Sequence, residues 1–279
     1  QNFLISASEG TTPEILLWDL QSWKLIRKFQ GHSDTVTSLI SLRDGHTVIS
    51  GSLDCAVKVW DISDDIPVQT IQENENSPVY NMHVFNDYSH FLTAGKSGDM
   101  FIYKMSYAYN KRYDRTVFET SRKVKCIKTG GPIFAINETM ARDNTIVCGG
   151  ADRAVSLWNT VTCMEQKRIG AHQTDVIGLV LIENPMKTKA NSYVLSFGNY
   201  EDRIQITDTS SGETKQMALD EDLSLTGHRY SNPSLQFMPL SDVFGKAKTY
   251  LLCSGTKNGS ACLVKILIEQ EEKEQALTF

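Results

Sequence analysis

Residues 31–62 decide the fold, and they read GHSDTVTSLISLRDGHTVISGSLDCAVKVWDI. This stretch contains three short runs rich in β-branched residues, in which apolar and polar side chains tend to alternate. The tight-turn dipeptide Asp44-Gly45 separates the first run from the second, and residues 52–54 separate the second from the third. Such runs, bounded by turn residues, predict three antiparallel strands. Because so small a sheet cannot bury both of its faces, we expect it to pack against copies of itself.

Degraded copies of the segment from Ser50 to Trp60 recur along the chain. The first three copies end 42 and 43 residues apart, and the later ones lie further apart because of insertions. A period of roughly 40–45 residues is typical of a four-stranded propeller blade. The equivalent end positions of the six copies are Trp18, Trp60, Tyr103, Trp158, Thr207 and Val264.

This pattern resembles that of the WD-repeat (Trp-Asp) β-propeller family. The resemblance is most specific in residues 31–62, good in residues 6–19 and 148–159, and weak in the last two copies. It implies an all-β fold, a β-propeller of four-stranded antiparallel blades with six visible repeats, and a single domain over residues 1–279. The first repeat lacks its innermost strand, so we expect an N-terminally incomplete chain from a seven-bladed parent. A six-bladed ring is the alternative.

The resemblance also implies a structural hydrogen-bond set, formed by His32, Ser50, Asp54 and Trp60. A buried indole N–H, imidazole or carboxylate must find a partner or cost several kcal/mol, and the set satisfies all of them together. In the fifth repeat the equivalents are His172 and Asp202, whereas the third and fourth repeats lack the histidine. The fourth has Gly131-Pro132 in that region. We therefore interpret the Ser, His and Asp of one repeat as scaffold and not as a hydrolase triad.

Three insertions are expected to be loops on one face of the propeller, at residues 106–121, 184–192 and 241–248. All three carry cations, and residues 106–121 also carry three tyrosines, in a protein of net charge −5. Tyrosine and arginine are common at interface hot spots, so these loops are candidate docking sites for other proteins with acidic or phosphorylated segments. Solvated surface loops and RNA contacts are the alternatives. The candidate partner-binding residues are Tyr107, Tyr109, Lys111, Arg112, Tyr113, Arg115, Lys187, Lys189, Lys246 and Lys248.

The opposite face is expected to carry Arg153 and Arg203, each directly after the acidic residue of a turn. Such arginines are candidate anion contacts, because a guanidinium binds phosphate or carboxylate through paired hydrogen bonds. Simple exposed charges are the alternative.

Composition excludes several other classes. A pI near 5.7 argues against general nucleic-acid binding, and no apolar run approaches the roughly 20 residues that span a bilayer. The six cysteines form no C-x-x-C pair and no zinc spacing, which indicates reduced thiols in an intracellular protein, cytoplasmic or nuclear. Phosphate-binding, hydrolase and metalloprotease motifs are missing, so no enzyme activity, cofactor or metal is expected.

A non-enzymatic protein–protein interaction scaffold within a larger complex is therefore the leading hypothesis. Substrate recognition for a ubiquitin ligase is the first alternative. Some family members dock the ligase adaptor with an Arg two residues after Trp-Asp, but here Leu20-Gln21 and Ile62-Ser63 follow instead. A propeller hydrolase is the alternative from another class.

Overall fold

The structure of the chain is a computed structural model. It describes residues 3–72, 77–138, 144–183, 192–199, 201, 203–218, 236–241, 247–253 and 262–266. Every regular element in these residues is a β-strand, and all pairing within the sheets is antiparallel. The all-β prediction is therefore confirmed.

The strands form six sheets in chain order, four of them four-stranded and two three-stranded, which we call blades one to six. Blade one contains β1 (Phe3–Ala7), β2 (Ile15–Asp19) and β3 (Lys24–Phe29). Blade two contains β4 (Val36–Ser41), β5 (Thr47–Ser52), β6 (Ala56–Asp61) and β7 (Pro67–Gln72). Blade three contains β8 (Val79–Val84), β9 (His90–Gly95), β10 (Asp99–Asn110) and β11 (Arg115–Lys128). Blade four contains β12 (Ile133–Glu138), β13 (Thr145–Gly150), β14 (Ala154–Asn159) and β15 (Met164–Ala171). Blade five contains β16 (Val176–Glu183), β17 (Ser192–Gly198), β18 (Arg203–Asp208) and β19 (Thr214–Ala218). Blade six contains β20 (Gln236–Ser241), β21 (Ala247–Cys253) and β22 (Cys262–Ile266).

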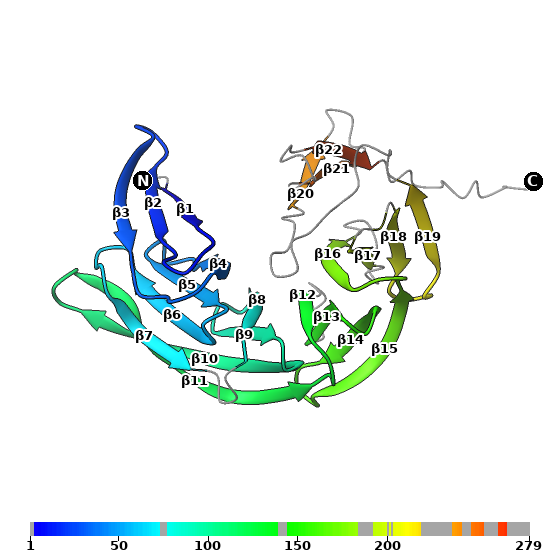
Figure 1. Cartoon of the computed structure of the whole chain (residues 1–279), viewed down its shortest axis with the longest axis horizontal. Coiled ribbons are helices and arrows are strands. Elements are labelled where there is room, and N and C mark those ends of the chain that lie inside the picture. The colour runs from blue at the N-terminus through cyan, green and yellow to red at the C-terminus, as the bar shows by residue number, and fades with distance from the viewer. Residues whose placement is uncertain are drawn as a thin grey trace, which may run out of the picture.

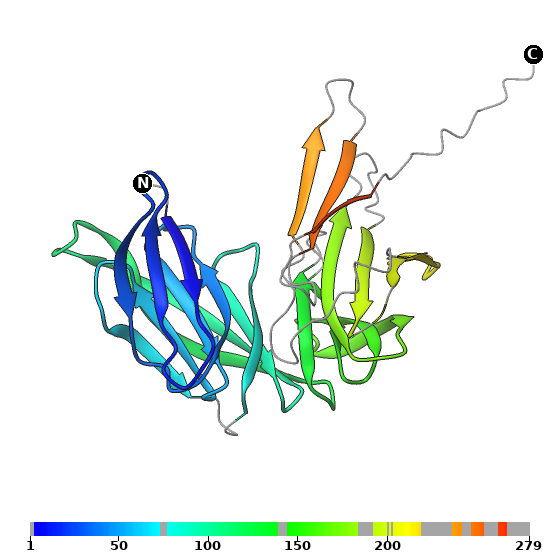
Figure 2. The ribbon, with the colours of Figure 1, turned by 45° about the horizontal axis from the view of Figure 1, so that its top comes forward.

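The blades stand side by side in an open arc, with blades one and six at its two ends (Figure 1). The tilted view in Figure 2 shows the same two end sheets facing each other across the open side. Neighbouring blades meet at their inner strands: the Thr37 hydroxyl donates to the Val79 carbonyl (2.7 Å), and the Asn81 amide donates to the Phe134 carbonyl (3.1 Å). The blade architecture of the WD-repeat prediction is confirmed, while the described strands do not close a ring.

The hydrophobic core lies between blades more than within them. Trp60 of blade two is 1% exposed and packs on Phe29 of blade one, with ring centroids 5.6 Å apart. Ile49 of blade two shares a cluster with Phe91 and Phe101 of blade three. Because each blade completes the core of its neighbour, we expect the blades to depend on one another for stability.

The insertion at residues 106–121 is a strand hairpin and not a loop. β10 and β11 extend beyond the ordinary blade length and pair as far as Asn110 with Arg115. Phe118 is buried in the cluster shared by blades two and three, and this contact holds the extension against blade two. The expectation of a loop was wrong because apolar side chains recur through the insertion with the spacing of a half-buried strand.

Candidate functional site

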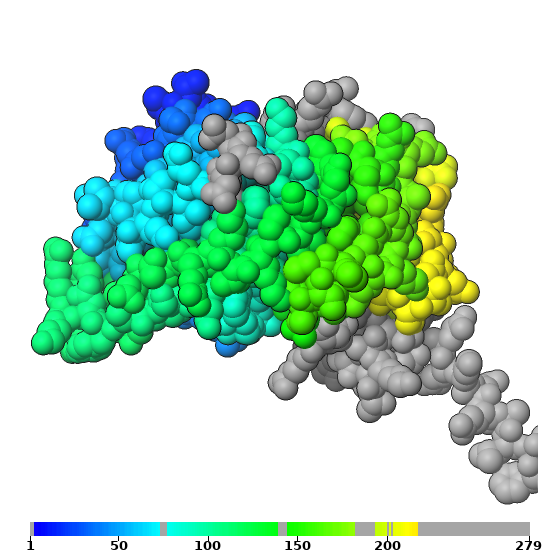
Figure 3. Space-filling model, turned by 90° about the horizontal axis from the view of Figure 1, so that it is seen from below, coloured from blue at the N-terminus to red at the C-terminus, as the bar shows by residue number. Residues whose placement is uncertain are grey.

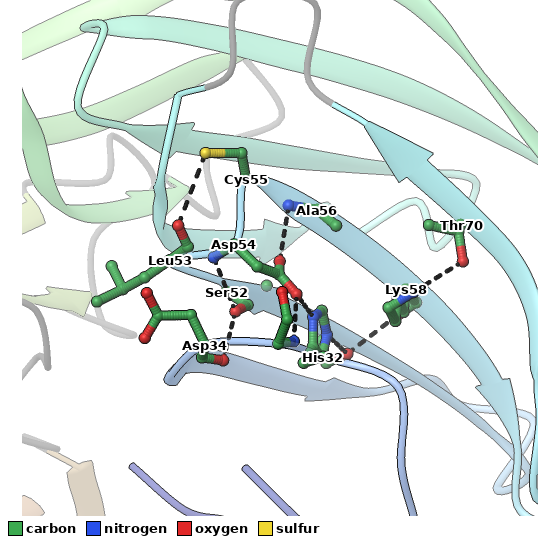
Figure 4. A network of polar contacts seen from close by, with 12 residues as sticks. His32, Asp34, Ser52, Leu53, Asp54, Cys55, Ala56, Lys58 and Thr70 are labelled. Atoms are coloured by element: carbon green, nitrogen blue, oxygen red, sulfur yellow. Dashed lines mark hydrogen bonds and ion pairs between the residues drawn. The ribbon is translucent and has the colours of Figure 1, made fainter. Parts of the chain in front are cut away.

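The polar set of blade two is a continuous chain of hydrogen bonds. Figure 4 shows His32 and Asp54 of this chain beside each other. His32 Nδ1 lies 2.8 Å from Asp54 Oδ2, and Nε2 lies 2.7 Å from Ser50 Oγ. The Trp60 indole N–H donates to the same Ser50 oxygen at 2.8 Å. The chain therefore ties the turn before β4 to β5, β6 and the turn between them.

Asp54 is held ionised by its partners. Burial raises the pKa of this carboxyl, but hydrogen bonds from His32 and from the Ser33 and Ala56 backbone N–H groups outweigh burial and leave the pKa below its ordinary value. Ser50 is fully buried and already accepts a hydrogen bond from Trp60, so it cannot reach a substrate as a nucleophile. The arrangement supports a structural role and offers no hydrolase chemistry.

Blade five repeats this arrangement with a different acid. His172 Nδ1 lies 2.6 Å from Glu201 Oε2, and Nε2 lies 2.8 Å from Ser196 Oγ. The expectation named Asp202, which lies outside the described residues. The turn before β18 is one residue longer than the turn before β6. Glu201 lies two residues before the start of β18, and it therefore takes the place that Asp54 has before β6.

Blade four retains the set only in part. Trp158 is the equivalent of Trp60, Cys148 that of Ser50, and Asp152 that of Asp54. His32 and His172 each lie four residues before the first residue of an inner strand, and the residue at that distance before β12 is Thr129. The backbone agrees, since Thr129 N–H donates to Gly98 O just as His172 N–H donates to Arg153 O. The histidine position of blade four is thus Thr129, and not Gly131-Pro132.

The missing imidazole leaves a small cavity in blade four, with a volume of about 10 Å³. Thr129, Cys148, Asp152 and Trp158 are among its lining residues. The Trp158 indole nitrogen is buried and has no hydrogen-bond partner among the described residues. Burial raises the pKa of the Cys148 thiol to about 12, so the thiol stays protonated.

The blade-three hairpin contains two groups of residues with opposite roles. Arg115 donates to both carboxylate oxygens of Asp61 at 2.8 and 3.0 Å, and Tyr113 donates to Asp64 at 2.6 Å. These two predicted partner-binding residues are therefore occupied within the chain, where they brace the hairpin on blade two. Tyr107 lies half-exposed beside Phe118, with the two rings edge to face.

The residues at the end of the hairpin point to solvent. Tyr109 is 61% exposed and its hydroxyl donates to the Asp114 carboxylate across the turn. Lys111 and Arg112 are exposed in the turn. We call Tyr109, Lys111 and Arg112 the tip surface. Figure 3 shows the end of the hairpin projecting beyond blade two at one edge of the molecule.

The other predicted site residues are not brought together with the tip surface. Lys187, Lys189 and Lys246 lie outside the described residues, and Lys248 lies in β21, opposite Leu240. Arg153 is exposed in a turn of blade four, whereas Arg203 begins β18 of blade five and donates to Gln216 at 3.1 Å.

The sequence interpretation missed a second cationic feature at the outer strand of blade three. Lys104 lies opposite Arg122 in the β10–β11 pairing, and Lys123 and Lys128 follow along β11. All four side chains are exposed, and none has an ion-pair partner among the described residues. We call Lys104, Arg122, Lys123 and Lys128 the cationic edge. The run RKVKCIK at residues 122–128 was the available signal, and it lies just beyond the predicted insertion.

A repeated side-chain contact links the outer strands to the next blade. Lys125 donates to Thr160 O at 2.7 Å, and Lys167 donates to the carbonyls of Thr209 and Ser210 at 3.2 and 3.0 Å. Lys125 lies opposite Ile102, and Lys167 lies opposite Leu157. Each of these partners directly precedes the residue equivalent to Trp60 in its blade. We call these contacts inter-blade braces, because each joins an outer strand to the following blade.

Metal and membrane chemistry find no support in the described residues. No group of three or more His, Cys, Asp or Glu side chains in these segments could hold a metal ion. In the part of the chain that the structure describes, we find no helix with the length and apolar character needed to cross a membrane.

Comparison with known proteins agrees with this architecture. The model of the family "WD domain, G-beta repeat" matches residues 23–61. WD repeat-containing protein 37 of Homo sapiens is 29% identical over 162 residues, which cover 57% of this chain and 30% of that protein. The probable coatomer subunit beta' of Schizosaccharomyces pombe is 28% identical over 145 residues, 50% of this chain and 16% of that protein. WD repeat and SOCS box-containing protein 1 of Homo sapiens is 27% identical over 106 residues, 38% of this chain and 25% of that protein.

These matches and the repeated four-stranded blades support the WD-repeat class for the chain, in which residues 23–61 match the family model itself. The chain spans less than two thirds of these relatives' own length: 30% of WD repeat-containing protein 37 and 16% of the coatomer subunit. WD-repeat domains generally mediate protein–protein interactions and are typically non-enzymatic.

Proposed function

We propose that this protein is a non-enzymatic scaffold that holds protein partners within a larger complex, and that the tip surface is one of its contact sites. The supporting observation is the way in which the hairpin is held. The Arg115–Asp61 and Tyr113–Asp64 contacts fix it to blade two, and Gln69 binds the Ser121 backbone from β7 at 2.8 and 3.0 Å.

A rigid projection loses little conformational entropy when a partner binds, which favours affinity. The tip surface combines an exposed aromatic ring with two cations, the residue types that dominate interface hot spots. Ile66, two residues from Asp64, is 74% exposed and adds apolar area beside the hairpin. This composition suits a partner with an acidic segment and some apolar side chains.

The test is affinity capture with the intact chain and the triple variant Tyr109→Ala/Lys111→Glu/Arg112→Glu. We expect the variant to lose one or more partners while it keeps its melting temperature, because none of the three side chains is buried. The matched control is Lys24→Glu/Lys215→Glu, which reverses two exposed cations on other blades. Equal partner recovery by all three proteins would exclude the tip surface as a contact site.

Substrate recognition for a ubiquitin ligase is the second candidate. Its support is the similarity to a relative whose name includes a SOCS box, and that similarity covers 38% of this chain. If this role holds, ligase subunits will be among the captured proteins. The residues that contact the substrate would then include the tip surface, so the triple variant would retain ligase subunits and lose the substrate.

A further inference from the structure

The repeat tryptophans of blades one, two and four differ in the partner of the indole N–H. In blades one and two the N–H donates to a serine hydroxyl, at 3.0 and 2.8 Å. In blade four Cys148 stands at the serine position, and the indole nitrogen of Trp158 is buried without a hydrogen-bond partner among the described residues. A thiol sulfur is a weak acceptor, so the cysteine does not replace the serine.

A buried N–H without an acceptor destabilises the folded state, because the group gave up its hydrogen bonds to water on folding. Buried polar groups in folded proteins are therefore paired with the protein or with ordered water. Trp158 is 8% exposed, and the opposed side chains of Cys148 and Ser156 beside it are 5% and 3% exposed. The position of the N–H thus points to an acceptor that enters the cavity of blade four.

This cavity is small and has polar walls. Its volume is about 10 Å³, roughly what one water molecule needs. Thr129 and Asp152 line it together with Trp158, and both keep capacity to accept. The Thr129 hydroxyl donates to Gly98 O at 2.7 Å, which leaves its lone pairs available. The Asp152 carboxylate accepts from the Ala154 backbone N–H at 3.2 Å through one of its two oxygens.

We propose that the cavity of blade four binds one ordered water molecule, which takes the place that the imidazole has in blade two. The water accepts from the Trp158 N–H and donates to Asp152 and Thr129, which gives the three hydrogen bonds typical of a buried water. The imidazole of blade two joins the serine hydroxyl to the turn aspartate in a similar way. Solvent thus completes the polar set of blade four, and a thiol is tolerated where blades two and five have a serine.

The size and chemistry of the cavity select water over other ligands. A volume of about 10 Å³ leaves no space for a larger organic molecule. Burial raises the pKa of the Cys148 thiol to about 12, so the site offers no thiolate to a metal ion. This inference is independent of the tip surface, because it concerns the interior of blade four.

The first test is a crystal structure of the full chain at a resolution high enough to show ordered water. We expect one solvent peak in the cavity, about 2.7–3.2 Å from the Trp158 indole nitrogen. A cavity without solvent density, or a Trp158 N–H that donates directly to the Cys148 sulfur, would overturn the proposal.

The second test replaces one tryptophan at a time with benzothienylalanine, in which a sulfur atom takes the place of the indole N–H. At position 158 we expect the melting temperature to fall by about 2–4 °C, the shift expected for one lost hydrogen bond in a domain of roughly this size. The control is the same replacement at position 60, where the N–H donates to Ser50, and it should give a fall of similar size. Removal of an N–H that has no partner leaves the melting temperature unchanged or raises it, so a fall at position 60 alone would also overturn the proposal.

Discussion

Rebuilding the polar set of blade four should create a measurable coupling between two residues. The double variant Thr129→His/Cys148→Ser places an imidazole and a hydroxyl where blade two has His32 and Ser50. Asp152 is already present to accept from the imidazole. The native backbone hydrogen bond of Thr129 N–H to Gly98 O (3.1 Å) is retained in the variant.

The magnitude follows from the partners that each substitution provides. Cys148→Ser gives the buried Trp158 N–H an acceptor but places a hydroxyl beside the cavity. Thr129→His fills the cavity but loses the Thr129 hydroxyl bond to Gly98 O (2.7 Å). Each single change therefore has gains and losses of about 1 kcal/mol that nearly cancel. The imidazole–hydroxyl bond exists only in the double variant, so we expect a favourable coupling free energy of about 1–2 kcal/mol.

Urea unfolding of the four proteins of this cycle, followed by tryptophan fluorescence and by circular dichroism, gives the coupling. Thr129→Val serves as a control for the loss of the hydroxyl without an added imidazole. If the change in unfolding free energy of the double variant equals the sum of the changes of the two single variants, the assignment of Thr129 to the histidine position is refuted.

Four further predictions rest on contacts of the polar set, the hairpin and the inter-blade brace. His32→Ala should lower the free energy of unfolding by about 1–3 kcal/mol, because it leaves buried partners unsatisfied; an unchanged urea midpoint would contradict the role of the set. The lowered pKa of Asp54 means that its stabilising effect is complete above the unfolded-state value near pH 4 and is lost as the pH falls through the folded-state value. Asp54→Asn should accordingly flatten the acid limb of a stability–pH curve, and an unaltered limb would exclude Asp54 as a contributor. Arg115→Leu strands Asp61, whose side chain is 8% exposed, and should increase trypsin cleavage in the hairpin turn, with Arg115→Lys giving a smaller increase. Lys167→Met keeps the aliphatic stem but removes the brace to blade five, and should cost roughly 1 kcal/mol in urea unfolding; no loss would show that the brace is dispensable.

Much of the fold could be predicted because each blade is encoded locally. In residues 31–62 the three predicted strands correspond to β4, β5 and β6, and the turn at Asp44-Gly45 lies between the first two. Equivalent positions in the later repeats follow from the same spacing. The extent of a single domain over residues 1–279 and the number of blades in a closed ring remain predictions.

The partners of the candidate site residues could not be predicted, because they come from distant parts of the chain. Tyr113 and Asp64 are 49 residues apart, and Arg115 and Asp61 are 54 residues apart. No local pattern indicates that a predicted loop bends back on the preceding blade. The acid of blade five was misassigned for a simpler reason, since one inserted residue shifts the count to Glu201.

The scaffold role is tested most directly by photo-crosslinking from the tip surface. A photoreactive amino acid is placed at position 109 and, as a control, at position 215, where Lys215 is exposed on blade five. In cells that express the intact protein, we predict a defined crosslinked partner from position 109 that is not obtained from position 215. The same background of crosslinks at both positions would contradict the proposed contact site.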